Sequence, residues 1–205
     1  MVPDGERSDD RSRRERADAA RNRRAILKAT ETLLAEHPPE QVSMERIAVA
    51  AGVGKGTVFH RFGSRAGLMR ELMLERAHAL RESVTDGPPP LGPGAPPRQR
   101  LLAFLDAVVD VVGRDKGLLA ALGQAATASC DAQEDSREQH SVYGFWHSHI
   151  STLIAEERPD PDAELLAHIL LGALQNRPIV HLLGQGEARR LAILLRLVVT
   201  GTLGA

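Results

Sequence analysis

Residues 43–62, SMERIAVAAGVGKGTVFHRF, contain two short apolar-periodic stretches on either side of a glycine-bearing turn. Ser43 is a good N-cap for the first stretch, and Gly52 permits a tight left-handed turn after it. The second stretch runs from about Gly54 to Phe62 and opens with small and basic residues. A pair of short helices around a glycine turn is typical of a helix-turn-helix. An ordinary helical hairpin inside a bundle has the same pattern.

Helical periodicity continues along the rest of the 205-residue chain, and only 3% of its residues are aromatic. Such a small aromatic share disfavours a sandwich or barrel, whose strands are rich in aromatic and β-branched residues. We therefore expect an all-α protein. The expected helices lie at about 21–37, 43–52, 54–62, 65–80, 101–112, 118–128, 137–157 and 162–183, with a last one after Gly186. Pro178 should kink or split the helix at 162–183.

Composition divides the chain into three parts. Residues 1–20 lack apolar periodicity and are expected to form a disordered basic arm. A three-helix domain is expected at 21–66 and a larger helical domain at 67–205. The run GPPPLGPGAPP at 87–97 must be a loop, because it suits neither helix nor strand.

Positive charge is concentrated near the N-terminus. The segment from Arg11 to Arg65 has 12 basic and six acidic residues, a net of +6 in a chain whose total is −1, so the remainder carries −7. The bias is strongest between Arg11 and Arg24. A basic segment on an otherwise acidic protein indicates contact with a polyanion, although a solvated tail has the same composition.

A helix that enters the DNA major groove needs a slender, polar and cationic N-terminal end. Lys55, Gly56 and Thr57 meet this demand with a cation, close backbone approach, and a hydroxyl beside a methyl. Helix N-termini also attract phosphates through free N–H groups and the helix dipole.

The stretch ILKATETLLAEHPPEQVSMERIAVAAGVGKGTVFHRFGSRAGLMRELM, within about residues 21–73, resembles the DNA-binding region of TetR-family transcriptional regulators. The resemblance implies a homodimer whose two recognition helices occupy successive major grooves of a palindromic double-stranded operator. It also implies a repressor that a small-molecule effector, bound in a C-terminal helical domain, releases from DNA. The alternative from another class is a helical interaction module without DNA affinity. The charged N-terminus and the lack of a long apolar run predict a cytoplasmic location.

Within that resemblance, Lys55, Gly56 and Thr57 face base edges, and Val58 is a further candidate for a thymine methyl. Phosphate contacts are assigned to Ser43, His60, Arg61 and Arg65, and to Arg21, Arg23 and Arg24 for the adjacent backbone or minor groove. Three positions depart from the family pattern. Gly54 stands where Ser or Thr commonly caps the recognition helix, and Phe59 stands where a tyrosine is usual and is expected in the core. Gly63 stands where a lysine often follows the aromatic motif, and Arg65 is a candidate to compensate for it.

The C-terminal part offers weaker signals. The candidate ligand pocket consists of Phe104, Val108, Leu122, Gln124, Thr127, Tyr143, Phe145, Trp146, His149, Leu170, Leu174 and Asn176, although simple core packing explains the aromatic residues equally well. The last two expected helices, at 162–183 and after Gly186, have more apolar surface than one face of a helical bundle can bury. A dimer interface is therefore expected at Leu171, Leu174, Leu191, Leu194, Leu195 and Val198, with ordinary core as the alternative.

Other function classes find little support. One cysteine, Cys130, excludes an intramolecular disulfide framework. His147 and His149 would point about 200° apart on a helix, so no metal site is expected. No GxSxG elbow occurs, so no enzyme and no cofactor are expected. No apolar run reaches the ~18 residues that span a bilayer.

Overall fold

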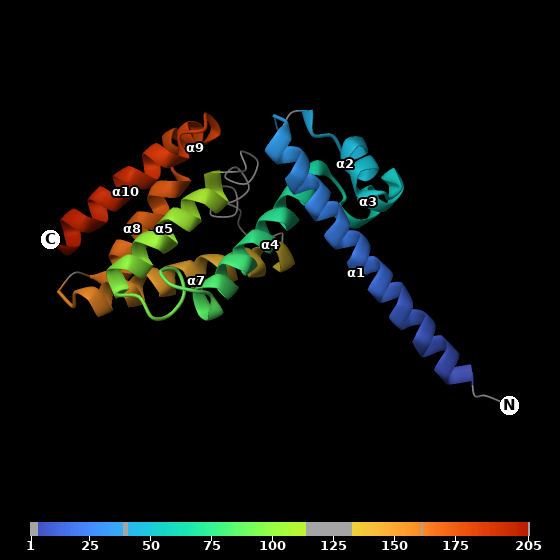
Figure 1. Ribbon diagram of the computed structural model, residues 1–205, viewed down its shortest axis with the longest axis horizontal. Helices are drawn as coiled ribbons and strands as arrows, with labels where there is room; N and C mark the ends of the chain where they lie inside the picture. The colour runs from blue at the N-terminus through green and yellow to red at the C-terminus, as the bar shows by residue number, and fades with distance from the viewer. Residues whose placement is uncertain (1–3, 39–40, 114–132, 161, 205) are drawn as a thin grey trace. The chain divides into compact units, whose positions relative to one another are not determined.

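The computed structural model describes residues 4–38, 41–113, 133–160 and 162–204, and within these ranges it contains helices and no strand (Figure 1). The expected all-α fold is confirmed. The helices are α1 (Asp4–Glu36), α2 (Met44–Ala51), α3 (Lys55–Phe62), α4 (Arg65–Asp86), α5 (Pro97–Gly113), α7 (Gln133–Glu157), α8 (Ala163–Gln175), α9 (Arg177–Gly184) and α10 (Ala188–Leu203). The helix expected at 118–128 lies outside the described residues.

Helix α1 begins at Asp4, so the prediction of a disordered arm over residues 1–20 was wrong for most of that segment. The segment lacks the apolar stripe that sequence reasoning relies on. It is rich in Arg and Ala, which are strong helix formers, and no proline interrupts the chain between Asp4 and Pro38. The segment therefore extends as a polar helix from the apolar-striped part of α1 that follows it.

The chain divides into two compact units, Met1–Leu72 and Met73–Ala205. The division falls inside α4, six residues beyond the boundary expected between residues 66 and 67. Leu68 and Leu72 explain the shift, because both are buried in the core that α1, α2 and α3 share. That first core consists of Ile26, Leu27, Val42, Met44, Ile47, Ala48, Val58, Phe62, Leu68 and Leu72.

In the second unit α5 packs against α7 and α10, and α7 also packs against α8 (Figure 1). The predicted kink or break near Pro178 is confirmed as a break at Asn176, which separates α8 from α9. Proline stands at the start of α9, where its missing N–H disturbs no helical hydrogen bond. Phe104, Leu105 and Val108 of α5 are the central buried residues of this core.

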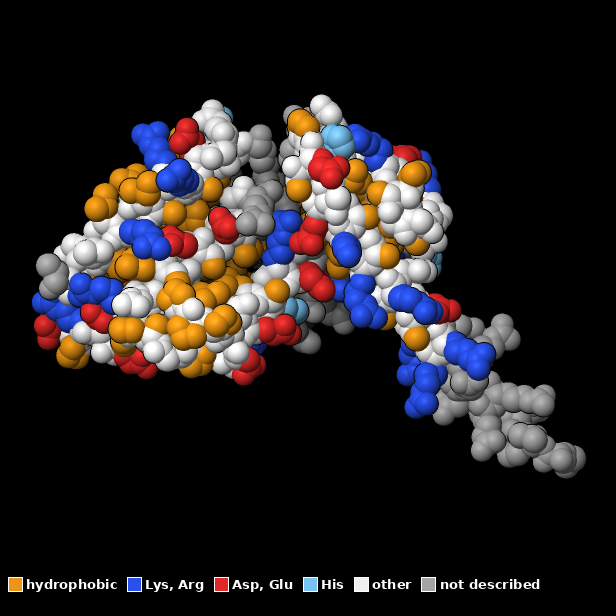
Figure 2. All heavy atoms as spheres, in the orientation of Figure 1, with side chains coloured by type: hydrophobic (Ala, Val, Ile, Leu, Met, Phe, Trp, Pro, Cys, Tyr) orange, Lys and Arg blue, Asp and Glu red, His pale blue; other side chains and the backbone are white. Residues whose placement is uncertain are grey.

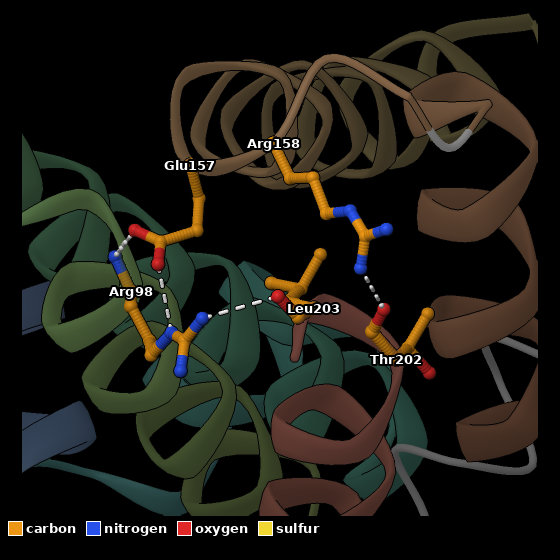
Figure 3. Close-up of polar contacts among 5 residues, drawn as sticks. All are labelled: Arg98, Glu157, Arg158, Thr202 and Leu203. Atoms are coloured by element: carbon orange, nitrogen blue, oxygen red, sulfur yellow. Dashed lines mark hydrogen bonds and ion pairs between the residues drawn. The ribbon is translucent and has the colours of Figure 1, made fainter. Parts of the chain in front are cut away.

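Polar contacts join the ends of three helices in the second unit (Figure 3). Arg98, at the start of α5, pairs through Nε with Oε1 of Glu157 at 2.8 Å, and its backbone N–H donates to Oε2 at 3.2 Å. Its Nη2 donates to the carbonyl of Leu203 at 3.2 Å. Arg158 donates from Nη1 to the carbonyl of Thr202 at 3.4 Å. These contacts fix the end of α10 against the end of α7 and the start of α5.

Two glycines of the first unit should respond in opposite ways to alanine. Gly52 has φ +66°, whereas Gly56 is helical with open space around the position of a Cβ. We expect Gly52→Ala to lower the free energy of unfolding by about 1–2 kcal/mol, because a Cβ is disfavoured in left-handed backbone. Gly56→Ala should raise it by up to about 1 kcal/mol through helix propensity. Urea denaturation of both variants measures the difference, and equal effects would contradict it.

Candidate nucleic-acid interface

The turn between α2 and α3 is built by backbone hydrogen bonds and a side-chain cap. Ser43 Oγ accepts the N–H of Arg46 at 3.2 Å, which confirms its N-cap role. After α2 the chain turns through left-handed Gly52, and the N–H of Val53 donates to the carbonyl of Ala48 at 3.0 Å. This hydrogen bond provides a donor for a free carbonyl at the end of α2, and the turn leads directly into α3.

Two neighbouring residues of α3, Val58 and Phe59, differ from expectation in their burial. Val58 is 0% exposed and packs in the first core, so its prediction as a contact to a thymine methyl was wrong. Phe59, expected in the core, is 39% exposed. Phe62 is the aromatic residue of α3 that is buried. The buried side of α3 is therefore the Val58–Phe62 side.

The N-terminal end of α3 is exposed. Lys55, Gly56 and Thr57 all lie at the surface, as expected of residues that contact a partner. Gly54 occupies the N-cap and makes no side-chain cap bond, and a Cβ added at Gly56 would meet nothing within 4 Å. The first turn of α3 thus offers a cation, a hydroxyl and uncapped N–H groups with little side-chain bulk. That set suits an anion or a base edge.

Lys55 has two partners within the first unit that the sequence did not reveal. Its Nζ lies 2.5 Å from Oε1 of Glu45 and 5.5 Å from the ring centroid of Phe59, a cation–π contact. The hydrogen bond from Lys55 is the largest cause that lowers the pKa of Glu45 from 4.5 to about 2. Glu45 stands in the first turn of α2, ten positions before Lys55, so no helical spacing links the two residues in the sequence.

The residues expected at phosphates fall into two groups. His60 and Arg61, in the last turn of α3, are exposed. Ser43 caps α2, and Arg65 donates from Nε to the carbonyl of Val42 at 3.1 Å, which ties the start of α4 to the segment before α2. For Ser43 and Arg65 a structural role therefore stands beside the predicted one.

The three arginines of α1 that were predicted to contact DNA also have intramolecular contacts. Arg23 pairs with Glu71 of α4 at 2.8 Å and is half-buried. Arg21 pairs with Asp18, and Arg24 Nε lies 3.4 Å from the carbonyl of Ala20. Figure 2 shows Lys and Arg side chains distributed along α1 as far as its described N-terminal part. Of the three, Arg21 and Arg24 are exposed.

The candidate ligand pocket is only partly brought together. Phe104, Val108, Trp146, Leu170 and Leu174 are buried in the second core. Asn176 caps the end of α8 and the start of α9 and is exposed, so the structure does not bring it together with these buried residues. Three further predicted residues, Leu122, Gln124 and Thr127, lie outside the described residues.

A cluster of rings lies between α5 and α7. The ring of His149 lies 4.7 Å from that of Phe104 and 6.0 Å from that of Phe145, measured between centroids. Burial, and then the nearby charge of Arg100, lower the pKa of His149 to about 4. Tyr143 is not part of this cluster: its hydroxyl hydrogen-bonds Nδ1 of His168 on α8 at 2.7 Å.

Three of the residues predicted at a dimer interface are internal. Leu171, Leu174 and Leu195 are buried within the second unit, so that prediction was wrong for them. Leu194 and Val198 are about half exposed, and Leu191 is half-buried. The large apolar residues that are exposed on α8 and α10 are Leu165, Ile169, Ile193, Leu194, Leu197 and Val198. Figure 2 shows hydrophobic side chains gathered over α10.

The described helices have two further properties that bear on function. Within the described ranges, no three His, Cys, Asp or Glu side chains form a group able to hold a metal ion. In the part of the chain that the structure describes, no helix combines the length and the apolar character that a membrane span requires.

The fold and the α2–α3 geometry define a helix-turn-helix protein with a second, helical unit. Residues 26–72 match the family model of bacterial regulatory proteins, tetR family. The match lies within the first unit, and there the chain is similar to this family of regulators. Over 73 residues it is 41% identical to the HTH-type transcriptional repressor LfrR of Mycolicibacterium smegmatis, an alignment that covers 33% of this chain and 38% of that repressor.

Solved structures share the fold over most of the chain. A TetR-like transcriptional regulator from Rhodococcus sp. RHA1 aligns with a TM-score of 0.56 and 21% identity, over 90% of this chain and 97% of that one. A regulator of the TetR/AcrR family from Thermobifida fusca aligns with a TM-score of 0.55 and 17% identity, over 85% and 96%. At these identities the likeness concerns the fold alone.

The Lys55–Glu45 pair predicts a titration result. We expect the pKa of Glu45 to be about 2 in the native protein and to rise toward 4.5 in Lys55→Met, which lacks the hydrogen-bond donor. The pair's contribution to folding stability is then complete above pH 4.5 and is lost as the pH falls toward 2. NMR titration of the Glu45 carboxyl measures the pKa. Lys28→Met is the control that leaves it low, and a wild-type value near 4.5 would contradict the pairing.

Proposed function

We propose that this protein is a homodimeric repressor that binds a palindromic operator in double-stranded DNA and is released by a small-molecule effector. The observation on which the proposal depends is the exposed, slender and cationic N-terminal end of α3, with Lys55, Gly56 and Thr57 at its surface. The family match over residues 26–72 includes this end of α3 and supports the proposal. The partial similarity to a protein described as a transcriptional repressor supports repression.

In this proposal, Lys55 and Thr57 contact base edges and the absent side chain of Gly56 permits close approach. Lys55 exchanges Glu45 for a base acceptor when DNA binds. His60 and Arg61 contact phosphates beside the groove. Arg21 and Arg24 extend the contact along α1 toward the adjacent backbone, while Arg23 positions α1 against α4 through Glu71.

The second copy is proposed to pack on α8 and α10. Leu165 and Ile169 lie one turn apart on α8, and Leu197 and Val198 follow Ile193 and Leu194 by one turn on α10. Large apolar patches of this kind are rare on monomers and mark interfaces. Gly172 and Gly201 have no atoms within 4 Å of an added Cβ, so the partner's helices can approach closely. Symmetry then presents two copies of α3 to half-sites about 34–36 Å apart.

Effector release is proposed to act through α4, which runs without interruption from the first unit into the second. An effector bound in the second unit need only favour a conformer in which the two α3 helices no longer match the half-site spacing. Cytoplasmic location and the absence of a cofactor belong to the same proposal.

Lys55→Ala tests the assignment of α3. We expect operator affinity to fall about tenfold or more, because a good side-chain-to-base contact contributes about 1–3 kcal/mol, while the dimer stays intact. The operator is first obtained by selection from random duplexes, and gel-shift titration at fixed salt gives the affinity. Lys28→Ala removes the same charge from the exposed side of α1 and should have a much smaller effect. Unchanged affinity in Lys55→Ala would overturn the assignment, and no duplex binding at low salt would favour an interaction module instead.

Leu197→Glu tests the interface. Leu197 is 64% exposed in the single chain, and in the proposed dimer a carboxylate there would be buried without a partner. We expect light scattering to show a monomer at micromolar concentration, with operator binding lost as well. Val49→Glu places the same charge on an exposed apolar position of α2 and should leave the dimer intact. A dimeric Leu197→Glu would contradict the assignment of this surface.

A further inference from the structure

Three buried nitrogen atoms on α5 and α7 have no hydrogen-bond partner among the residues that the structure describes. They are Nε1 of Trp146, Nε2 of His149 and Nε of Arg100. Trp146 is only 4% exposed and precedes His149 by one helical turn. Buried polar groups are almost always paired, so unpaired ones require an explanation such as a bound molecule. If the contact between α5 and α7, here called the seam, served packing alone, we would expect apolar side chains at these three positions.

The same seam has flat apolar walls and positive charge. His149 lies between the rings of Phe104 and Phe145, whose own centroids are 6.5 Å apart and nearly perpendicular. Arg100 is close enough to His149 to disfavour its cationic form. The guanidinium of Arg81, on α4, lies 4.9 Å from the centroid of Phe145. Arg100, Phe145 and His149 are half-buried, so the seam is not sealed from the outside.

We propose that the seam between α5 and α7 binds a small organic acid with a flat apolar body, whose carboxylate is held by Arg100. Its apolar body packs against Phe104 and Phe145, and the N–H of Trp146 donates to an oxygen of the ligand. This inference rests on the proposed function, since it names the class of the effector.

The residues distinguish an acid from other ligand classes. Arg100 and Arg81 repel a cation, and two unpaired N–H donors require acceptor atoms, which a carboxylate supplies in plenty. The neutral imidazole of His149 adds either a donor or an acceptor, depending on its tautomer. A purely apolar ligand would leave all three nitrogen atoms unpaired and would gain nothing from Arg100.

Trp146 is the only tryptophan of the chain, so its fluorescence reports on this seam alone. The test is titration of the full-length protein with 4-nitrobenzoate and with the neutral isostere 4-nitrobenzamide, both of which carry a quenching nitro group. Free N-acetyltryptophanamide corrects for absorption by the probes. We expect saturable quenching by the acid, with at least about tenfold tighter binding than the amide.

Arg100→Gln is the decisive variant, because it keeps a polar side chain of similar reach and removes the charge. We expect about tenfold weaker binding of 4-nitrobenzoate, with the amide unaffected. Arg189→Gln, on the exposed side of α10, is the matched control and should bind like the wild type. Circular dichroism checks that each variant is folded. NMR titration of the His149 ring supplies an independent readout, because a bound carboxylate raises its pKa from about 4.

Equal binding of acid and amide, or no saturable quenching by the acid, would overturn this inference even if Arg100→Gln failed to fold. Neither result would affect operator binding, which is measured without any probe. Conversely, a wild-type protein that bound no duplex would overturn the proposed function and leave the result of the probe titration standing.

Discussion

The packing of α3 on its buried side is the constraint on which the rest of the first unit depends. Val58 and Phe62 enter a core formed by α1, α2 and the start of α4, and the left-handed turn at Gly52 leaves α3 only a short path to reach that core. Once Val58 and Phe62 point inward, helical geometry places Lys55, Gly56 and Thr57 at a free end. The chemistry offered to a partner is thus a consequence of where two apolar residues are buried.

Electrostatics then determines the resting state of that free end. Lys55 is held by Glu45 and lies over Phe59, so its ammonium group is placed by the protein rather than left to solvent. An exposed ion pair of this kind contributes little to stability. In the proposed function, Lys55 leaves Glu45 when DNA binds, so Glu45 competes with the DNA for the ammonium group and weak acceptors are disfavoured.

The sequence predicted local structure well where the signals were local. The limits of α2 and α3 followed from Ser43, Gly52 and Gly54, each of which acts on its own turn. Residues 4–20 were missed because a polar helix has no apolar stripe to detect. Phe59 was expected inside because it lacks the hydroxyl of the usual tyrosine, but the packed core leaves Phe59 exposed and buries Val58 completely. Leu171 and Leu195 were assigned to the wrong side, since helices with apolar residues on several faces do not reveal which face turns inward. Glu45 was missed because its partner lies across a turn.

The border between the two units lies inside α4 rather than in a flexible linker. Each residue of an α-helix advances the chain by about 1.5 Å and turns it by about 100°. A chimaera that joins this N-terminal unit to the sensor of a relative must therefore keep the helical phase as well as the length of α4. Insertion of a single amino acid near Met73 would rotate everything downstream by more than a quarter turn. The two units can therefore be exchanged between relatives only if the number of residues in α4 preserves the helical phase. For the same reason, insertions and deletions in α4 should be far rarer in evolution than substitutions.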